Sequence, residues 1–260
     1  MKLRNDKVLI FGGGGGIGMA IAQRLIDEGA KVTIVGRSMD KLENAAAKIG
    51  SKNLFVLQGD IANVSSHRQM LELAAEYMGG LNVMINSAAV DPNTARGYDP
   101  FDVTEEEWDR QTGINLKGAF FILRNTIQYM VEHKIKGNIL MIASNAAYVP
   151  IFGQYGSSKR CVVEWVKSFG KQYGHKGIVI NGIAPGSTYT PMIYQYAKSA
   201  DEPFPRHALE RFILPEEIAE LAYYLLSDMG EIICGTTVTA DAGDYGHVLK
   251  QGEDGEYYYG

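Results

Sequence analysis

The sequence lacks several features, and each absence narrows the kinds of protein it can encode. It has only two cysteines among 260 residues, Cys161 and Cys234, which are too few for a disulfide framework and are expected to be buried free thiols. Its 25 basic residues form no cluster among 30 acidic ones, so nothing predicts binding to nucleic acid or to an anionic membrane. Its first apolar stretch, residues 8–11, is too short for a signal peptide, and no stretch reaches membrane-spanning length. We therefore expect a cytoplasmic protein.

Histidines are also few, and their spacing argues against a metal site. None of the five stands at a separation typical of metal ligands, and no His-Glu-x-x-His motif is present. We expect no metal and interpret the histidines as surface residues: His67, His133, His175, His207 and His247.

Short apolar segments alternate with longer amphipathic ones along most of the chain. This alternation predicts an α/β fold: one Rossmann-type, doubly wound parallel sheet of about seven strands with helices on both faces. The expected strands are residues 8–11, 32–35, 54–57, 83–85, 139–142, 179–183 and 237–240. The expected helices include 19–28, 39–49 and 67–78, one that starts at the Thr104-x-x-Glu107 capping box and runs toward Met130, and one that starts at Pro215.

One domain, residues 1–243, accounts for this pattern, followed by a C-terminal extension over 244–260. Residues 185–214 differ from the rest because they contain four prolines and several aromatic residues without a clear period. We interpret 186–214 as a long, partly helical loop that contacts the substrate, since long loops in compact domains are usually functional.

A glycine-rich turn follows the first expected strand and opens a helix. Glycine lets backbone amides approach a pyrophosphate, and the helix N-terminus favours its negative charge. A P-loop is excluded because no Lys-Ser or Lys-Thr follows the glycines. The residues expected to contact a dinucleotide here are Gly12, Gly15, Gly16, Ile17 and Gly18.

The second expected strand ends at Gly36-Arg37 without a carboxylate. An acidic residue at this place binds the ribose hydroxyls of NAD, whereas an arginine accommodates the extra phosphate of NADP. Arg37 therefore favours NADP(H) over NAD(H), although no basic residue in the glycine turn supports it and NAD stays open.

Tyr155 and Lys159 are four residues apart, which places them on one face of a helix. An ammonium group near a phenol favours the phenolate and suits the tyrosine to general acid/base catalysis. The spacing alone is weak, because Tyr194 and Lys198 share it.

The order of the motifs is more specific than any one of them. Over about residues 5–243 the chain resembles the short-chain dehydrogenase/reductase family, in its compact single-domain branch. The matching positions are Gly12, Gly16, Gly18, Asp60, Asn86 to Ala89, Asn115, Ser144, Tyr155, Lys159, Pro185, Gly186 and Thr190.

The resemblance implies roles for several of these residues and for their neighbours Ile61 and Thr188. Tyr155 would exchange the hydroxyl proton, Lys159 would lower its pKa and hold the nicotinamide ribose, and Ser144 would hydrogen-bond the reacting oxygen. Asn115 would support a water-linked proton path from Lys159. The adenosine would be contacted by Asp60, Ile61, Asn86 and Ala88, and the carboxamide by Thr188 and Thr190.

The chain also departs from the family pattern. Phe11 replaces a threonine that braces the glycine turn, and Ser87-Ala88-Ala89 replaces Asn-Ala-Gly. Ser144 stands closer to Tyr155 than the family usually has it, which predicts a shortened loop across 148–153.

Aromatic and apolar residues of the 186–214 loop favour a substrate with an apolar cyclic body, such as a hydroxysteroid. A sugar, a polyol or a 3-oxoacyl group stays an alternative, as does simple packing of the loop. The expected substrate contacts are Asn145, Tyr148, Tyr189, Met192 and Tyr196.

Two further expectations concern the whole molecule. The resemblance implies a homotetramer or dimer built on the helices that hold Asn115 and Tyr155. The three tyrosines Tyr257 to Tyr259 suggest that the tail docks over the active site or on a neighbouring subunit. A catalytically silent dinucleotide sensor is the alternative from another functional class, but it would have no reason to keep Ser144, Tyr155 and Lys159.

Overall fold

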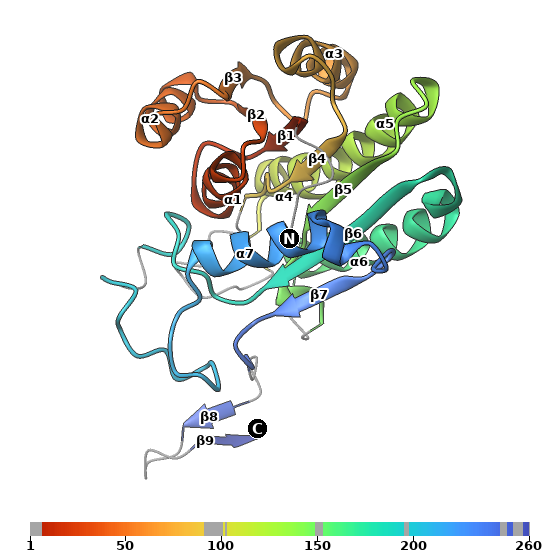
Figure 1. Ribbon diagram of the computed structural model, residues 1–260. Coiled ribbons are helices and arrows are strands. Elements are labelled where there is room, and N and C mark those ends of the chain that lie inside the picture. The colour runs from red at the N-terminus through yellow and green to blue at the C-terminus, as the bar shows by residue number, and fades with distance from the viewer. Residues whose placement is uncertain are drawn as a thin grey trace.

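Seven parallel strands form one sheet in the order β3-β2-β1-β4-β5-β6-β7 in the computed structural model (Figure 1). The structure describes residues 7–90, 101, 103–148, 153–194, 198–244, 249–251 and 257–259. The strands are β1 (Lys7–Phe11), β2 (Lys31–Gly36), β3 (Leu54–Gln58), β4 (Val83–Asn86), β5 (Gly137–Ile142), β6 (Ile178–Pro185) and β7 (Thr237–Ala240). The doubly wound α/β sheet predicted from the sequence is thereby confirmed, with each expected strand in place.

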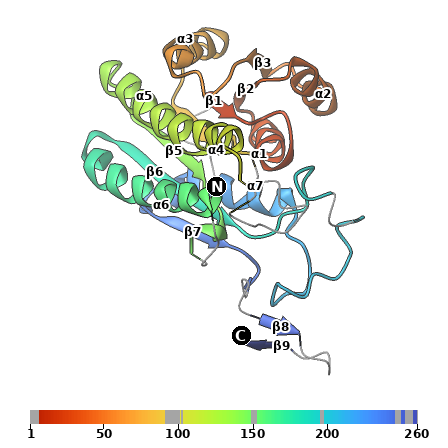
Figure 2. The same cartoon turned by 180° about the vertical axis from the view of Figure 1, so that it is seen from behind.

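Helices cover both faces of the sheet (Figures 1 and 2). Helices α1 (Gly16–Asp27), α2 (Met39–Ile49) and α7 (Pro215–Leu226) pack on one face, and α3 (His67–Met78), α5 (Ala119–Glu132) and α6 (Gln154–Tyr173) pack on the other. Alternate side chains of β1 enter the two cores: Val8 and Ile10 join the first, and Leu9 and Phe11 the second. Burial on both faces explains why the strands are almost continuously apolar.

The long helix expected after Thr104 is interrupted. Thr104 and Glu107 form the capping box of α4 (Glu105–Thr112), as predicted, but a π-helical turn, η4 (Gly113–Gly118), separates α4 from α5. A Cβ on Gly118 would lie 2.7 Å from the Ile61 carbonyl oxygen, so this turn is packed tightly against the loop after β3. π-Helical turns inside helices often mark functional sites.

The substrate loop after β6 also differs from the prediction. Its described residues, 186–194 and 198–214, contain no helix and are held instead by isolated backbone bridges between Thr188 and Ile213 and between Pro203 and Arg211. Its three prolines, Pro191, Pro203 and Pro205, explain the difference, because each lacks an amide donor and restricts the residue before it. A short antiparallel hairpin, β8 (Leu249–Gln251) with β9 (Tyr257–Tyr259), lies apart from the main sheet (Figure 1).

Two predictions about single residues were wrong. His67 and His207 are fully buried, not surface residues, because both ring nitrogens of each have polar partners inside the protein. Burial also lowers the pKa of His67. The cysteines are free, as expected, but Cys161 is half-buried and Cys234 is exposed. Among the described residues, no helix is long and apolar enough to cross a membrane, and no group of three metal-binding side chains occurs.

Candidate active site

A large groove runs along the carboxyl ends of the parallel strands, where ligands bind in open α/β sheets. Its volume of about 2020 Å³ exceeds that of the pocket of one small ligand, which is roughly 300–1,000 Å³. The groove therefore has room for a dinucleotide and a substrate together. Its walls come from the glycine turn, the ends of β2 to β6, the start of α6 and the substrate loop.

In the glycine turn, the packing requires Gly12 and Gly18 to be glycines, whereas Gly15 leaves space. Gly12 has a φ of +78°, and a Cβ there would lie 2.7 Å from the Ala88 backbone nitrogen. A Cβ on Gly18 would lie 2.4 Å from the Gly12 carbonyl oxygen, so Gly18 lets α1 approach the turn. Gly15 is the N-cap of α1, and its backbone is extended. A Cβ at this position would meet no atom within 4 Å. The open space before the helix N-terminus fits a pyrophosphate.

The end of β2 carries an exposed arginine at the rim of the groove. Arg37 uses its backbone carbonyl to accept a 2.9 Å hydrogen bond from Gln58 Nε2, and its guanidinium has no partner among the described residues. Ser38 caps α2 as expected by accepting from the Lys41 amide. Arg37, Ser38 and Lys41 all line the groove, and no acidic side chain ends β2.

The residues expected around the adenosine follow or end β3 and β4; Asp60, Ile61 and Ala88 line the groove, whereas Asn86 is buried and lies outside its lining. Asp60 Oδ1 accepts a 2.9 Å hydrogen bond from the Ala62 amide, and Ile61 is buried beside it. Asn86 Oδ1 accepts from the Ala88 amide at 3.1 Å, which shapes the turn after β4. Phe11 is fully buried in the core, and its backbone carbonyl still accepts from the Ser87 amide at 2.9 Å. The backbone thus joins β1 to β4 where a threonine hydroxyl would add a side-chain bond.

Tyr155 and Lys159 lie in the first turns of α6 and face the groove. The Lys159 Nζ lies 5.6 Å from the centre of the Tyr155 ring and donates a 3.0 Å hydrogen bond to the Ile142 carbonyl at the end of β5. Only 4% of Lys159 is exposed, and this burial lowers its pKa to about 8. The second pair with the same spacing is not comparable, because Lys198 lies outside the groove lining and Tyr194 is 52% exposed.

Ser144 follows β5 and lines the same groove as Tyr155 and Lys159. Its Oγ accepts a 3.2 Å hydrogen bond from the Ala146 amide, which starts the 3₁₀ turn η5 (Asn145–Ala147). Residues 149–152 of the loop predicted to be short lie outside the described residues. The hydroxyls of Ser157 and Ser158 are tied to backbone carbonyls of Gly153 and Tyr155.

Asn115 occupies the centre of the π-helical turn and is buried. Its side chain makes two hydrogen bonds to Val90: Oδ1 accepts from the amide at 2.9 Å, and Nδ2 donates to the carbonyl at 2.7 Å. These bonds fix the segment after β4, where it forms a wall of the groove. The side chain of Asn115 therefore stabilises the backbone of this wall at Val90.

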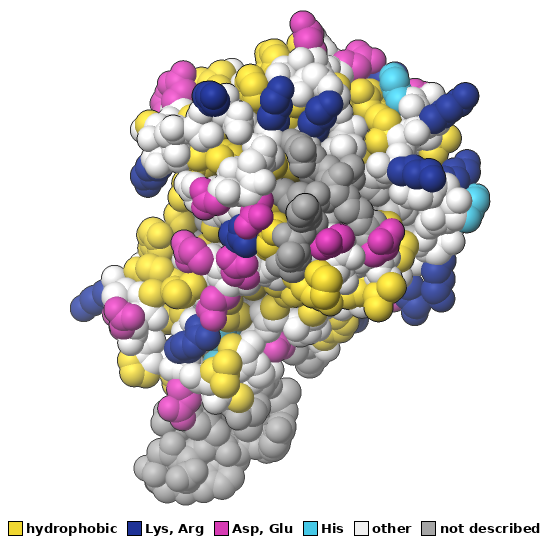
Figure 3. Space-filling view, in the orientation of Figure 1, with side chains coloured by type: hydrophobic (Ala, Val, Ile, Leu, Met, Phe, Trp, Pro, Cys, Tyr) yellow, Lys and Arg dark blue, Asp and Glu magenta, His cyan; other side chains and the backbone are white. Residues whose placement is uncertain are grey.

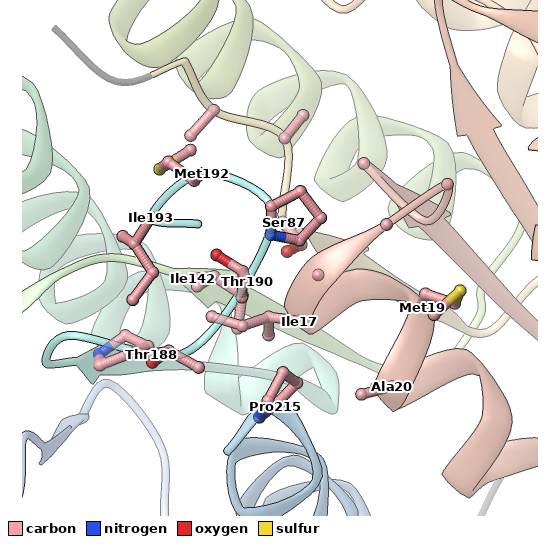
Figure 4. A pocket seen from close by; sticks show the side chains of 18 of the residues that line it. Ile17, Met19, Ala20, Ser87, Ile142, Thr188, Thr190, Met192, Ile193 and Pro215 are labelled. Atoms are coloured by element: carbon pink, nitrogen blue, oxygen red, sulfur yellow. The ribbon is translucent and has the colours of Figure 1, made fainter. Parts of the chain in front are cut away.

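Thr188 and Thr190 begin the substrate loop and line the groove, and Thr190 lies nearer to the glycine turn (Figure 4). Thr188 Oγ1 donates a 3.0 Å hydrogen bond to the Gly186 carbonyl. Figure 4 shows Thr190 between Ser87 and Ile17, and a Cβ on Gly16 would lie 3.3 Å from its side chain. Met192 and Ile193 continue the loop on one side of the groove, and Met19 and Ala20 of α1 lie on the other.

The expected substrate contacts divide into three groups. Tyr189 and Met192 line the groove, and the Tyr189 ring packs on Tyr194 at 4.7 Å between ring centres. Tyr148 is 49% exposed and lies outside the groove lining, whereas Tyr196 lies outside the described residues. Part of the aromatic content packs the loop on itself, since Phe204 and Phe212 have ring centres 4.3 Å apart.

Asn145, the remaining expected contact, has a partner that the sequence did not indicate. Its Nδ2 donates a 2.6 Å hydrogen bond to Asp244 Oδ2, and Arg206 Nη2 lies 3.3 Å from the same oxygen. All three residues line the groove. The sequence pattern places Asp244 in the tail, and no spacing motif links residues 99 positions apart, so only the fold could identify this contact.

Elsewhere, acidic and basic side chains are intermixed on the face seen in Figure 3, which agrees with the absence of a basic patch predicted from the sequence.

Comparisons with known proteins agree with this geometry. Residues 13–244 match the family model described as enoyl-(acyl carrier protein) reductase. A 2,5-dichloro-2,5-cyclohexadiene-1,4-diol dehydrogenase of Sphingobium indicum is 32% identical over 248 residues, which cover 93% of this chain and 97% of that protein. The crystal structure of a short chain dehydrogenase from Bacillus anthracis superposes with a TM-score of 0.81 at 32% identity and covers 93% of this chain and 98% of that one.

A third relative was solved with a cofactor. The 3-ketoacyl-(acyl-carrier-protein) reductase of Brucella melitensis, complexed with NADH, has a TM-score of 0.81 at 27% identity and covers 92% of this chain and 98% of that one.

Proposed function

The chain belongs to the short-chain dehydrogenase/reductase family and is a nicotinamide-dependent oxidoreductase, and from this premise we propose that it interconverts a secondary alcohol and a ketone with Tyr155 as general acid/base. The observation that carries the proposal is the joint presence of Ser144, Tyr155 and Lys159 on one wall of the groove. A binding protein without chemistry needs none of these three side chains there.

In the proposed mechanism the protein moves a proton and holds an oxygen. The Tyr155 hydroxyl gives its proton to the carbonyl oxygen in reduction and takes it from the alcohol in oxidation. Ser144 Oγ donates a hydrogen bond to the same oxygen and so favours the charge that develops on it. Lys159, in its ammonium form, favours the phenolate of Tyr155 by charge.

Asn115 acts at a distance from the reacting carbon. Its side chain bonds to the Val90 backbone and so fixes the position of the π-helical turn relative to the segment after β4, which forms one wall of the groove. We assign it the support of a water-linked proton path from Lys159, and the tight turn is consistent with that role.

The residues of the groove fit a nicotinamide dinucleotide, which supplies or accepts the hydride when it is bound. Gly12, Gly15, Gly16, Ile17 and Gly18 would hold the pyrophosphate, since the space above Gly15 is open. The adenosine would lie against Asp60, Ile61 and Ala88, with Asn86 shaping the turn that holds Ala88, and the carboxamide against Thr188 and Thr190. Tyr155 and Lys159 would lie near the nicotinamide ribose.

NADP(H) is the proposed cofactor, in preference to NAD(H). The guanidinium of Arg37 has no partner among the described residues and stands at the strand end where the adenosine ribose binds in such folds. A phosphate there would gain a bidentate, charge-assisted contact.

For the substrate we propose an alcohol or ketone on a compact apolar ring. Tyr189, Met192 and Ile193 give the substrate end of the groove an apolar wall. The dehydrogenase of a cyclohexadiene diol among the relatives supports a ring. A 3-oxoacyl substrate is the second candidate, favoured by the ketoacyl reductase that shares the fold.

A panel of ring alcohols, ring ketones, polyols and 3-oxoacyl thioesters tests the proposal, with absorbance of the reduced nicotinamide followed for both cofactors. Turnover of ring compounds above the other classes supports it. A protein that binds the dinucleotide but turns over no member of the panel would be a sensor, and the proposal would fail.

Three whole-molecule predictions stay predictions. They are a cytoplasmic location, assembly into dimers or tetramers through the helical segments that hold Asn115 and Tyr155, and docking of the 244–260 extension, which follows the domain 1–243, over the active site or on a neighbouring subunit. Analytical ultracentrifugation of the full chain and of a chain that ends at residue 244 tests the last two. If the extension docks as predicted, the shorter chain should differ from the full chain in oligomeric mass or in its Michaelis constant.

A further inference from the structure

Three segments that are distant in sequence meet at one carboxylate beside Ser144. Asp244 follows β7, Arg206 belongs to the substrate loop, and Asn145 follows Ser144 after β5. The Asp244 side chain is only 1% exposed. A buried carboxylate is costly unless it is paired, so this contact set is a specific arrangement and not a loose surface contact.

The carboxylate fixes the orientation of the neighbouring amide. A carboxylate oxygen accepts and does not donate, so the Asn145 group that lies 2.6 Å from Asp244 Oδ2 must be the NH₂. Asn145 Oδ1 then faces Ser144 Oγ at 3.4 Å. Asp244 thereby orients the side chain that stands next to the hydroxyl assigned to the reacting oxygen.

Arg206 has hydrogen-bond donors that its contact with Asp244 does not use. Arg206 reaches Asp244 through Nη2 alone, at 3.3 and 3.4 Å, which is longer than a charge-assisted bond of about 2.7–2.9 Å. Its Nε is buried without a hydrogen-bond partner within the described part of the chain, whereas the side chain as a whole is 40% exposed and lines the groove. A guanidinium carries five N–H donors, so the two on Nη1 and the second one on Nη2 are the donors available to a ligand.

The charges of the group favour a neutral ligand. Asp244 offsets the charge of Arg206, and His207 Nε2, which lies 3.8 Å from Asp244, accepts a hydrogen bond from the Ser187 amide. An anion that approached Arg206 would also meet the carboxylate. A hydroxyl or keto oxygen would not be repelled in this way.

We propose that Asn145, Arg206 and Asp244 form a subsite for a second, uncharged oxygen function of the substrate, held at one end of the groove while the first oxygen reacts at Ser144 and Tyr155. This inference rests on the proposed function and specifies its substrate class as ring diols and hydroxyketones. The subsite is a specificity determinant, because it recognises a group that takes no part in the reaction.

Binding and turnover of matched ring alcohols test the subsite separately. We would measure Kd by calorimetry for cyclohexanol, for the 1,2-, 1,3- and 1,4-cyclohexanediols and for a hydroxycyclohexane carboxylate, with the Tyr155→Phe chain loaded with oxidised cofactor so that no turnover interferes. The same compounds give kcat/KM with the unmodified chain. We expect at least one diol to bind about tenfold more tightly than cyclohexanol, the value of one hydrogen bond to a charged group.

The variant Arg206→Met removes the guanidinium donors, together with the contact of the guanidinium carbon 5.9 Å from the centre of the Phe204 ring, and leaves an apolar side chain at this position. We expect it to reduce the diol-to-cyclohexanol ratio about tenfold. The matched control is Arg211→Met, which removes an arginine of the same loop that pairs with Glu217 and lies outside the groove lining, and it should keep the ratio. If Arg206→Met proves unstable, Arg206→Lys removes the guanidinium donors while it keeps a positive charge beside Asp244, and the same loss is expected.

The outcomes separate the two proposals. Equal affinities for diols and cyclohexanol, a preference for the carboxylate, or an unchanged ratio in Arg206→Met overturns the subsite. Diol-selective binding without turnover of any alcohol or ketone supports the subsite and overturns the proposed dehydrogenase activity.

Discussion

Lys159 Nζ lies 5.6 Å from the centre of the Tyr155 ring and is held there by a hydrogen bond to the Ile142 carbonyl. The contact joins the first turns of α6 to the end of β5, where Ser144 follows two residues later. The sheet thus fixes the position of the ammonium relative to the phenol. Substitution of Tyr155 therefore tests the proposed proton transfer, and substitution of Lys159 tests the effect of the buried ammonium.

Tyr155→Phe is expected to lower kcat at least 100-fold, because the proton donor and acceptor is lost, while the Kd of the nicotinamide cofactor changes little. Steady-state kinetics and fluorescence titration measure the two effects. Tyr194→Phe is the control, since Tyr194 shares the Tyr-x-x-x-Lys spacing, and it should lower kcat less than about tenfold. Comparable losses in both variants would contradict the assignment of Tyr155.

Lys159→Met is expected to remove activity and yet stabilise the cofactor-free protein at pH 7. Burial lowers the Lys159 pKa from its ordinary value of 10.5 to about 8, so the unfolded chain binds more protons between these pH values and Lys159 makes stability rise with pH there. At pH 7 the charged, buried lysine opposes folding. Its removal should raise the free energy of unfolding by about 2 kcal/mol, after subtraction of the lost hydrogen bond to the Ile142 carbonyl.

Urea unfolding of both chains at pH 7 and pH 10 measures this gain. It should shrink at pH 10, where the folded protein already holds the lysine uncharged and most of the cost of burying a charge is gone. A difference in unfolding free energy that is the same at both pH values would show that charge burial is not its cause.

Arg37→Ala is expected to raise the KM for NADPH at least tenfold and to leave the KM for NADH within about threefold, because one charge-assisted phosphate contact is lost. Kinetics with both cofactors at two ionic strengths give the values. Lys48→Ala, at the far end of α2, is the matched control for loss of a positive charge on the same rim. Equal effects of Arg37→Ala on the two cofactors would argue against a phosphate contact.

Gly36→Asp is expected to shift the preference toward NADH, because a carboxylate at the end of β2 binds ribose hydroxyls and repels a phosphate. The backbone accepts the change, since a Cβ at Gly36 would meet Leu42 at an ordinary contact distance of 3.4 Å. The ratio of kcat/KM values for NADH and NADPH measures the shift. A thermal unfolding scan confirms that the variant is folded, and a ratio that moves toward NADPH would contradict the prediction.

Gly15→Ala is expected to leave the unfolding temperature nearly unchanged and to weaken cofactor binding at least tenfold. Gly15 is extended and a Cβ there meets nothing within 4 Å, so only a bound pyrophosphate would be displaced. Gly12→Ala is the contrasting variant, since its Cβ would collide with Ala88 and should destabilise the fold itself. Undiminished cofactor affinity in a folded Gly15→Ala protein would place the pyrophosphate elsewhere.

Much of the fold was predictable because its signals are local. Strands buried on both faces need unbroken apolar runs, and the runs at β1, β4 and β5 mark them within a residue or two. The capping box of α4 joins Thr104 to Glu107 within four consecutive residues, so the sequence predicts it as well. The π-helical turn had no such signal, because it depends on Asn115 meeting Val90, 25 residues earlier in the chain.

The candidate site divides in the same way. The glycine turn and the Tyr155–Lys159 spacing are short-range features, and their order along the chain identified the family. The burial of His207 and the subsite at Asp244 depend on how the loop after β6 folds onto the segment after β7. No periodicity encodes a contact between segments about 40 residues apart when neither is a helix or a strand.

The sequence by itself was enough to predict the doubly wound sheet and to propose the glycine turn and the Tyr155–Lys159 pair, because their signals are short segments in a fixed order along the chain. Only the tertiary structure decided that Asn145 faces Asp244, that the substrate loop contains no helix in its described part, and that Lys159 is buried enough to lower its pKa. Desolvation and long-range hydrogen bonds exist only once distant segments pack together, and they govern the substrate end of the groove.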